Sequence, residues 1–346
     1  MIYFNSDYLE GAHPALLEKL NETNMVQTVG YGEDEYCAAA REKIKAACQA
    51  PEADVHFLVG GTQTNTTVIA AILRPWQGVL SAVSGHINCH EAGAIESTGH
   101  KVITLPTTNG KITAQQVRDY VEWHKHDEST EHIVQPGMVY ISHPTEGGTL
   151  YTKAELTELY GTCREYGLPL FIDGARLGYG LMADESDMTL PELARLCDVF
   201  YIGGTKVGAL FGEAVVIMNE SLKKDFRFIM KQRGGRMAKG RLLGVQFDAL
   251  FTDDLYFKIS RHAIEMAHQI RDIFVSAGYP LLFDSPTNQQ YPIMPDTELA
   301  KIGKRFGYEY WERVDADHSG VRFCASWATK QEHVDALREA VNALKK

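Results

Sequence analysis

The feature that most constrains this chain is a regular alternation between short apolar runs and longer stretches with helical periodicity. The apolar runs have the length of strands and occupy residues 55–59, 78–83, 101–105, 138–142, 168–172, 199–202 and 214–218. The helical stretches occupy residues 13–21, 36–49, 62–73, 86–98, 113–124, 152–166 and 189–196. Such alternation with short connections predicts an α/β fold, in which a mainly parallel sheet is covered by helices on both faces.

The pattern changes after residue 255. A long amphipathic helix is expected from Phe257 onward, because its apolar residues recur on one stripe. Strands are then expected at 281–283, 290–293, 308–314 and 320–326, and helices at 296–306 and 330–344. We therefore predict a large domain over residues 15–255 and a smaller C-terminal α+β domain over residues 256–346, preceded by an N-terminal segment, residues 1–14.

The composition of the 346 residues is that of an ordinary globular protein, with 45% apolar and 23% charged residues. A formal net charge of −11 argues against general binding to nucleic acid or to an anionic membrane. A local basic cluster within residues 223–241 runs against this balance and could hold small anions. The six cysteines are scattered, and neither a signal peptide nor a membrane-spanning run is evident. We expect a soluble cytoplasmic protein with reduced thiols.

Two predicted strands end on groups that can do chemistry together. Lys206 follows one apolar strand after two glycines and a threonine, and Asp173 ends another. A lysine that reacts with an aldehyde needs a crevice that desolvates its amine, and strand ends in α/β folds provide one. A carboxylate nearby can keep a pyridine nitrogen protonated, so the pair indicates an enzyme that uses pyridoxal 5'-phosphate (PLP). The alternative is two unrelated turns, with Asp173 as a helix cap and Lys206 solvated, in a non-catalytic α/β binding protein.

A glycine-rich turn at Gly60-Gly61-Thr62 joins an expected strand to an expected helix. The free N–H groups and the dipole at the start of a helix favour a phosphate, and the glycines allow its close approach. The same residues are also typical of a tight turn in which Thr62 caps the helix. The spacing matches neither nucleotide-binding fingerprint, so nucleotide binding is disfavoured.

His86 follows the expected strand 78–83 directly, where an aromatic ring could stack on a flat cofactor. The alternative is a helix-capping or buried structural histidine. His86 and His90 also have the i, i+4 spacing of zinc ligands, but no third ligand follows at a recognisable spacing. We therefore expect no metal site.

Two more segments hold candidate site residues. The loop Ser142–Gly148 follows a strand, and within it Glu146 or His143 could act as a general base, or both could simply shape the turn. Arg322 interrupts an apolar strand of the second domain, where its guanidinium could clamp a substrate carboxylate. The alternative for Arg322 is a surface position on an edge strand.

Taken in order, these pieces resemble the threonine aldolase group of the β-eliminating lyase family, which are PLP enzymes of the aspartate aminotransferase fold (fold type I). The resemblance runs through nearly the whole chain, from Ser6-Asp7 to Arg322. The matching segments are Tyr31-Gly32-Glu33-Asp34, Gly61-Thr62-Gln63-Thr64-Asn65, His86-Ile87 with Glu91 and Gly93-Ala94, Asp173-Gly174-Ala175-Arg176, and Lys206 with the Gly-rich strand after it. The resemblance implies cleavage of a β-hydroxy-α-amino acid, such as threonine, allo-threonine or phenylserine, to glycine and an aldehyde. The nearest rivals are β-elimination and transamination of another amino acid with the same cofactor.

The resemblance also assigns roles to individual residues. Lys206 is then the lysine that binds PLP covalently, Asp173 the partner of its ring nitrogen, and His86 the residue that stacks on the ring. The other implied PLP contacts are Gly61, Thr62 and Gln63 at the phosphate, Arg176 near the phenolic oxygen, and Thr205. Ser6 of the N-terminal segment and Arg322 are implied to hold the substrate carboxylate, and Tyr31 to line the site. Active sites shared between subunits imply a homodimer or homotetramer.

Two departures from the family pattern concern the substrate. Where bacterial threonine aldolases have a histidine in an Asn-Thr-His loop, this chain has Pro144-Thr145-Glu146. A carboxylate there places a different base near the substrate hydroxyl and is similar to the phenylserine aldolase branch. The family's Gly-Gly-Gly-Met-Arg segment is here Gly234-Gly235-Arg236-Met237-Ala238, so Arg236 or Lys239 takes the place of its arginine, and Lys231 matches an upstream lysine.

Overall fold

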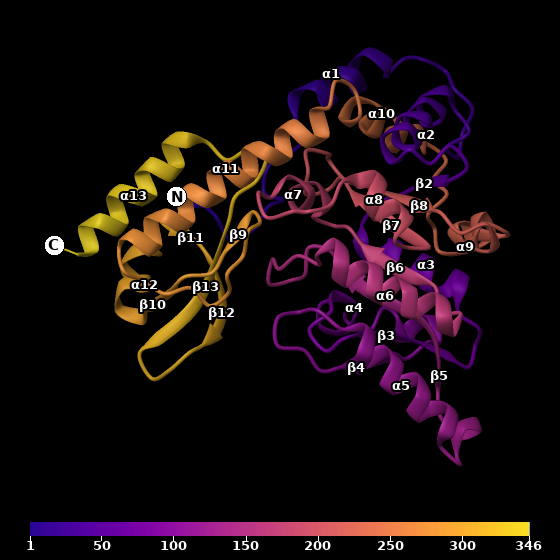
Figure 1. Ribbon diagram of the computed structural model, residues 1–346. Coiled ribbons are helices and arrows are strands. Elements are labelled where there is room, and N and C mark those ends of the chain that lie inside the picture. The colour runs from indigo at the N-terminus through magenta and orange to yellow at the C-terminus, as the bar shows by residue number, and fades with distance from the viewer. Residues whose placement is uncertain (346) are drawn as a thin grey trace.

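A seven-stranded sheet organises the larger part of the computed structural model, which describes residues 1–345 (Figure 1). The order across the sheet is β2-β8-β7-β6-β5-β3-β4. The strands are β2 (Asp54–Leu58), β3 (Gln77–Ala82), β4 (Val102–Leu105), β5 (Gln135–Ser142), β6 (Leu170–Asp173), β7 (Val199–Gly203) and β8 (Glu213–Ile217). Within this sheet β8 runs opposite to the other six strands, which share one direction. All seven expected strands form, and the prediction of a mainly parallel sheet is confirmed.

Helices cover both faces of this sheet, because alternate side chains of each strand point to opposite sides. In β5, Val139 and Ile141 join one apolar cluster, whereas Met138 and Tyr140 join the other. The first cluster is completed by α1 (Pro14–Thr23), α2 (Glu35–Cys48), α5 (Ala114–His126), α6 (Lys153–Tyr166), α7 (Leu177–Met182), α8 (Leu190–Arg195) and α10 (Arg241–Leu250). The second is completed by α3 (Gly61–Ile72), α4 (His86–Cys89) and α9 (Phe226–Gln232). The prediction of a sheet covered on both faces is therefore confirmed.

The prediction of one helix over residues 86–98 is wrong. Only α4 forms there, and a separate 3₁₀ turn, η1, covers Glu96–Thr98. Between them Ala92 and Gly93 have positive φ angles of 50° and 73°, and a right-handed helix cannot continue through such residues. The other 3₁₀ turns in the described chain are η2 (Thr130–His132) and η3 (Glu220–Leu222).

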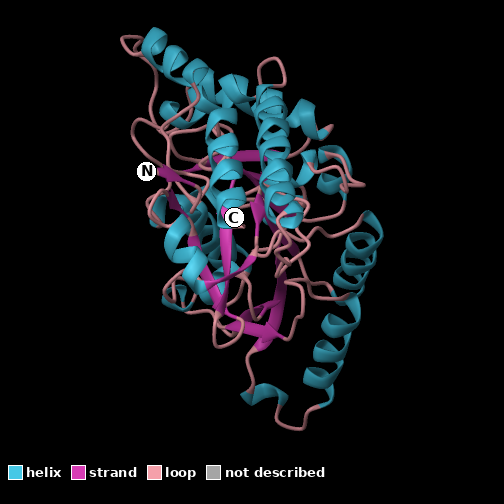
Figure 2. Cartoon of the chain, turned by 90° about the vertical axis from the view of Figure 1, so that its left-hand side faces the viewer, coloured by secondary structure: helices cyan, strands magenta, loops and turns pink. Residues whose placement is uncertain are grey.

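The C-terminal residues form a smaller layer beside the large sheet (Figure 1). Its helices are α11 (Leu255–Ser276), α12 (Asp296–Ile302) and α13 (Gln331–Leu344), and its strands are β9 (Gln289–Gln290), β10 (Ile293–Pro295), β12 (Glu309–Arg313) and β13 (His318–Cys324). In Figure 2, which looks at this layer from its outer side, two long helices lie in front of the strands. The expected strand at 281–283 is reduced to one bridge between Leu281 and Pro292, and the expected helix 296–306 ends at Ile302.

The N-terminal residues belong to this smaller layer as well. β1 (Ile2–Tyr3) pairs in parallel with β11 (Phe306–Gly307), and Phe4 packs in the small apolar cluster. The chain then leads directly to Ser6 and Asp7, both buried. The first residues of the chain therefore reach the interior between the two layers.

Helix α11 belongs to both layers. Its first half contributes Ile259, Ala263 and Ile264 to the core of the large sheet. Its second half contributes Met266, Ala267, Ile270, Ile273 and Phe274 to the core of the small layer. Although α11 has 22 residues, neither it nor any other helix within residues 1–345 is long and apolar enough to cross a lipid bilayer.

Candidate active site

A cavity of about 280 Å³ lies at the carboxyl ends of β5, β6 and β7. Parallel strands in α/β sheets present their ligand sites at this edge. Strand register aligns Ser142 with Asp173, and Gly203 with Glu213, so side chains distant in sequence face one space. The sequence-predicted residues that line the cavity are Gly61, Thr62, His86, Glu146, Asp173, Arg176, Thr205 and Lys206.

Asp173 is held as a buried carboxylate. It is 4% exposed and accepts hydrogen bonds from Tyr140 at 2.6 Å, from Tyr201 at 2.5 Å and from Asn65 at 3.1 Å. Burial alone would raise its pKa, but the charge of His86 and these hydrogen bonds outweigh that effect and lower the pKa of Asp173. An ionised carboxylate on the cavity wall can hold a protonated nitrogen of a bound ring.

Lys206 enters the same cavity just after β7. Gly203 and Gly204 precede it, and a Cβ atom on Gly203 would lie 2.2 Å from the main-chain oxygen of Ala175, so no larger residue fits there. Burial lowers the pKa of the Lys206 ammonium, and the positive charge of Arg176 lowers it further. Both effects favour the neutral amine, which is the nucleophilic form of lysine.

His86 stands at the start of α4 and lines the cavity. Its Nδ1 lies 2.8 Å from Oε1 of the buried Glu91, and Asn65 donates to the same oxygen at 2.7 Å. Burial would lower the pKa of His86, but the hydrogen bond to Glu91 and the charge of Asp173 raise it. The contact with Glu91 therefore fixes the orientation of the His86 ring.

Glu146 lines the cavity, whereas the other candidate base does not. Ser142 donates to Glu146 Oε1 at 2.6 Å, and the main-chain N–H of His86 donates to the same oxygen at 2.8 Å. Burial raises the pKa of Glu146. His143 is buried away from the cavity, where its Nδ1 accepts a 3.4 Å hydrogen bond from the main chain of Tyr151, and burial lowers its pKa to about 4. Of the two alternatives, the geometry favours Glu146.

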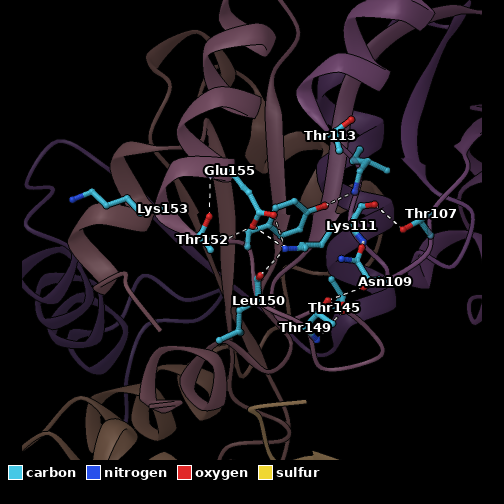
Figure 3. Close-up of polar contacts among 12 residues, drawn as sticks. Thr107, Asn109, Lys111, Thr113, Thr145, Thr149, Leu150, Thr152, Lys153 and Glu155 are labelled. Atoms are coloured by element: carbon cyan, nitrogen blue, oxygen red, sulfur yellow. Dashed lines mark hydrogen bonds and ion pairs between the residues drawn. The ribbon is translucent and has the colours of Figure 1, made fainter. Parts of the chain in front are cut away.

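The loop that carries Glu146 is braced by the segment between β4 and α5 (Figure 3). Thr149 Oγ1 lies 2.7 Å from Thr145 Oγ1 and donates to the main-chain oxygen of Asn109 at 2.7 Å. Lys111 Nζ donates to Glu155 at 2.6 Å and to the main-chain oxygen of Leu150 at 3.2 Å. These contacts tie the loop to the segment between β4 and α5.

The start of α3 forms the end of the cavity that suits an anion. Gly60, Gly61 and Thr62 line it, and Gly60 at the N-cap has no side chain to bond the first N–H groups of the helix. Gln63 is not brought to the cavity. Its Oε1 accepts from the main chain of Val59 at 3.1 Å and its Nε2 donates to that of Arg233 at 3.1 Å.

Arg176 is already paired within the chain. Its Nε donates to Asp7 Oδ2 at 2.7 Å and its Nη2 to Asp7 Oδ1 at 3.0 Å. Burial opposes ionisation of Asp7, but the charge of Arg176 dominates and lowers the pKa of Asp7 to about 2. The pair fixes the guanidinium on the cavity wall.

Three predicted substrate contacts lie outside the cavity lining. Arg322 is 8% exposed on β13, donates to Gln289 at 2.9 Å and to the main chain of Asn5 at 3.1 Å, and pairs with Glu309. Ser6 is buried, and within residues 1–345 its Oγ has no hydrogen-bond partner. Tyr31 is 47% exposed and lies between Lys231 and Arg236, with Lys231 Nζ 4.7 Å from its ring centre.

The model of the β-eliminating lyase family matches residues 4–341. The chain belongs to this family. A threonine aldolase of Leishmania major has a TM-score of 0.97 to this lyase and 42% sequence identity, with all of both chains covered. The low specificity L-threonine aldolase of Pseudomonas aeruginosa is 28% identical over 337 residues, which cover 96% of this chain and 95% of that enzyme. The resemblance to the threonine aldolase group is therefore confirmed.

The fold of the lyase is also that expected from the sequence. An aspartate aminotransferase of Thermus thermophilus gives a TM-score of 0.71 at 13% identity, with 99% of this chain and 91% of that chain covered. Similarity at this level concerns the fold alone. It confirms the prediction of the aspartate aminotransferase fold.

Three residues of this lyase escaped the sequence analysis. Asp7 pairs with Arg176, and the sequence does not indicate this role. Glu213 lines the cavity beside Lys206 from the start of β8. Tyr291 contacts the main chain of Glu146 from the small layer. A charged residue at the start of an apolar strand is a visible signal for Glu213, but no local pattern marks the other two contacts.

Proposed function

We propose that this lyase is a PLP-dependent aldolase that cleaves a β-hydroxy-α-amino acid, such as threonine, allo-threonine or phenylserine, to glycine and an aldehyde. The observation that carries the proposal is that one cavity holds Lys206, Asp173 and Glu146 in a chain that matches threonine aldolases over its whole length. An aldolase needs all three groups, since cleavage combines covalent attachment, an electron sink and removal of a hydroxyl proton.

The residues present fit PLP. Lys206 offers a poorly solvated amine, Asp173 an ionised carboxylate, and the start of α3 an anion site without a side-chain cap. When bound, PLP supplies a conjugated ring that accepts the electron pair released at the substrate Cα. Lys206 would bind the cofactor covalently, Asp173 would keep its ring nitrogen protonated, and His86 would stack on the ring. Gly61 and Thr62 would bind its phosphate.

Glu146 would take the proton from the substrate hydroxyl. Its Oε1 is occupied by Ser142 and by the N–H of His86, whereas no residue within 1–345 donates to Oε2. The carboxylate is thus fixed by one oxygen and free at the other. Its raised pKa also suits a group that holds a proton during the reaction.

Arg322 and Ser6 would bind the substrate carboxylate. Both are buried where the small layer meets the N-terminal segment. A guanidinium fixed at one end of the substrate determines which Cα bond stands perpendicular to the ring, and this choice separates aldol cleavage from transamination. Arg322 is held in place by Gln289 and by the main chain of Asn5.

We infer that the enzyme is a homo-oligomer. Tyr31 is half-exposed beside Lys231, outside the cavity lining of its own chain, and exposed apolar side chains continue along the same segments at Met25, Val29 and Phe228. A second copy that covers this surface would bury them and could bring Tyr31 to a neighbouring site. Light scattering on the purified enzyme tests this, and a monomer with full activity contradicts it.

The function is tested with a panel of amino acids. The purified protein with added PLP is incubated with L-threonine, L-allo-threonine and phenylserine, and glycine and aldehyde are both measured. Stoichiometric release of the two products supports the proposal. Formation of a 2-oxo acid without glycine instead identifies elimination or transamination as the main reaction.

A further inference from the structure

Glu213 is a buried acid on the wall of the cavity that the aldolase chemistry does not use. It is the first residue of β8, is 3% exposed, and stands opposite Gly203 of β7. It lines the cavity together with Lys206 and Thr205. On its other side it pairs with Leu58, which leads into the Gly60-Gly61-Thr62 turn, so the acid lies between Lys206 and the anion end of the cavity.

Both oxygens of Glu213 are bonded to the residues just before Lys206. Oε1 lies 2.8 Å from Thr205 Oγ1, and Oε2 accepts the main-chain N–H of Gly204 at 3.1 Å. Thr205 Oγ1 in turn accepts the N–H of Gly212 at 3.0 Å. The acid and the hydroxyl thus form one unit that ends in the cavity.

The surroundings of Glu213 disfavour its charged form. Within residues 1–345, no lysine, arginine or histidine forms an ion pair with Glu213. The ionisable groups whose charges act on it or that its charge acts on are Lys206, Asp173 and the buried phenols of Tyr201 and Tyr256. Burial raises the pKa of Glu213 to about 8, although Thr205 and Lys206 oppose the increase. A phosphate bound nearby would oppose ionisation further, since like charges repel.

The protonation state of Glu213 decides what Thr205 can donate to. A serine or threonine hydroxyl has one donor proton and two acceptor lone pairs. When Glu213 is ionised, Thr205 must donate its proton to the carboxylate. When Glu213 is neutral, its O–H can donate to Thr205 Oγ1, and the hydroxyl proton of Thr205 becomes free to point into the cavity.

We propose that Glu213 is a positioning residue that carries a proton while the cavity holds the phosphate of its cofactor, so that Thr205 donates its hydroxyl proton to that phosphate. The inference rests on the PLP cofactor of the proposed function. It explains why a carboxyl group stands at the end of the cavity where an anion is expected. It also gives Thr205 a defined contact that its place in the sequence alone does not.

The test measures PLP affinity in a Lys206→Ala background, which removes the covalent bond and its own pH dependence. Because Lys206 lowers the pKa of Glu213, removing Lys206 moves the ionisation of Glu213 in the free protein above about pH 8. At pH values above that ionisation, binding to the protein that retains Glu213 must take up one proton. Its affinity should therefore fall about tenfold more per pH unit than that of the Glu213→Gln variant. Glutamine keeps the shape of the neutral acid and can donate to Thr205, so it serves as the matched control.

Two comparisons make the result specific. Pyridoxal, which lacks the phosphate, should show the same pH dependence with Glu213 present and with the Glu213→Gln variant. Thr205→Val should weaken PLP binding and reduce the effect of Glu213→Gln on the pH dependence to the part that charge repulsion alone produces, because the intermediate hydroxyl is gone. Identical PLP curves with and without Glu213→Gln, a difference that persists with pyridoxal, or a difference that is undiminished in the Thr205→Val background would overturn the proposal.

The measurement is independent of catalysis. If PLP binds but β-hydroxy amino acids are not cleaved, the aldolase proposal fails while the role of Glu213 is still decided by the binding curves. If the protein binds no PLP at pH 7, the role of Glu213 fails together with the cofactor.

Discussion

The hydroxyl of Tyr291 donates a 2.8 Å hydrogen bond to the main-chain oxygen of Glu146. Tyr291 is fully buried in the small layer, with its ring edge-on to Phe283 and Trp311 at 5.0 and 4.9 Å. Gln289 donates to the same oxygen at 3.4 Å and accepts from Arg322 at 2.9 Å. The residue proposed to bind the substrate carboxylate is thereby linked to the residue proposed to take the hydroxyl proton.

Tyr291→Phe removes one hydroxyl from this link and keeps the ring packing. We expect kcat for cleavage of β-hydroxy substrates to fall about two- to tenfold, the effect of one net hydrogen bond, with the visible spectrum of bound PLP unchanged. Tyr308→Phe is the matched control, because its hydroxyl donates to Leu299 inside the small layer. Equal losses in the two variants would show a general effect on packing.

Glu146→Gln tests the base. Since a general base contributes a factor of about 10² to 10⁴, we expect at least a hundredfold loss of glycine release from β-hydroxy substrates. Exchange of the glycine α-proton, followed by NMR, should be spared because it involves no hydroxyl group. Parallel loss of both activities would assign Glu146 a structural role in its loop.

Asp173→Asn tests the partner of the ring nitrogen. The variant should bind PLP, as judged by visible absorption, and lose most of its turnover, because an unprotonated pyridine is a poorer electron sink. Turnover at the wild-type rate would remove Asp173 from the mechanism.

Arg322→Lys keeps the charge and loses the planar fork. We expect kcat/KM to fall about ten- to a hundredfold, with the PLP spectrum unaltered. Arg313→Lys provides the control, since Arg313 lies on the neighbouring strand β12 and makes an exposed ion pair with Asp296. Wild-type kinetics for Arg322→Lys would exclude a bidentate contact with the substrate.

Asp7 makes stability depend on acid pH. Its pKa is lowered from 3.8 to about 2, so the stabilisation is fully present above about pH 4 and is lost as the pH falls towards 2. The shift corresponds to about 2 kcal/mol. In urea unfolding, the free energy of unfolding of Asp7→Asn should fall furthest below that of the wild type near neutral pH. This difference should become smaller below about pH 4. Asp184→Asn breaks an exposed pair with Arg261 and should show a much smaller difference.

The fold was largely predictable because its signals are local. The runs that became β2 to β8 are apolar and strand-length, and alternation with helices leaves few other arrangements. The prediction failed at residues 86–98, where Ala92 has a positive φ angle, although alanine is not a residue type that indicates such a conformation. Tertiary contacts, not propensity, decide such a position.

The site was predictable only in part, for a related reason. Lys206, Asp173, His86 and Glu146 each follow or end a strand, and the ends of parallel strands meet. The link between Asp7 and Arg176 joins residues 169 positions apart, and that between Tyr291 and Glu146 joins residues 145 apart. Periodicity carries no information about such pairs. Gln63 shows the opposite case. It lies inside a matching motif, but its side chain forms hydrogen bonds with the main chain and does not reach the cavity.

Helix α11 has a mechanical consequence. This one helix packs in both apolar cores, so it joins the layer that carries Glu146 to the layer that carries Arg322 by a continuous helix. Any widening of the gap between them must bend the helix or shift its packing in one core, and both are resisted by close-packed side chains. The distance between Glu146 and Arg322 is therefore set by the fold before substrate binds.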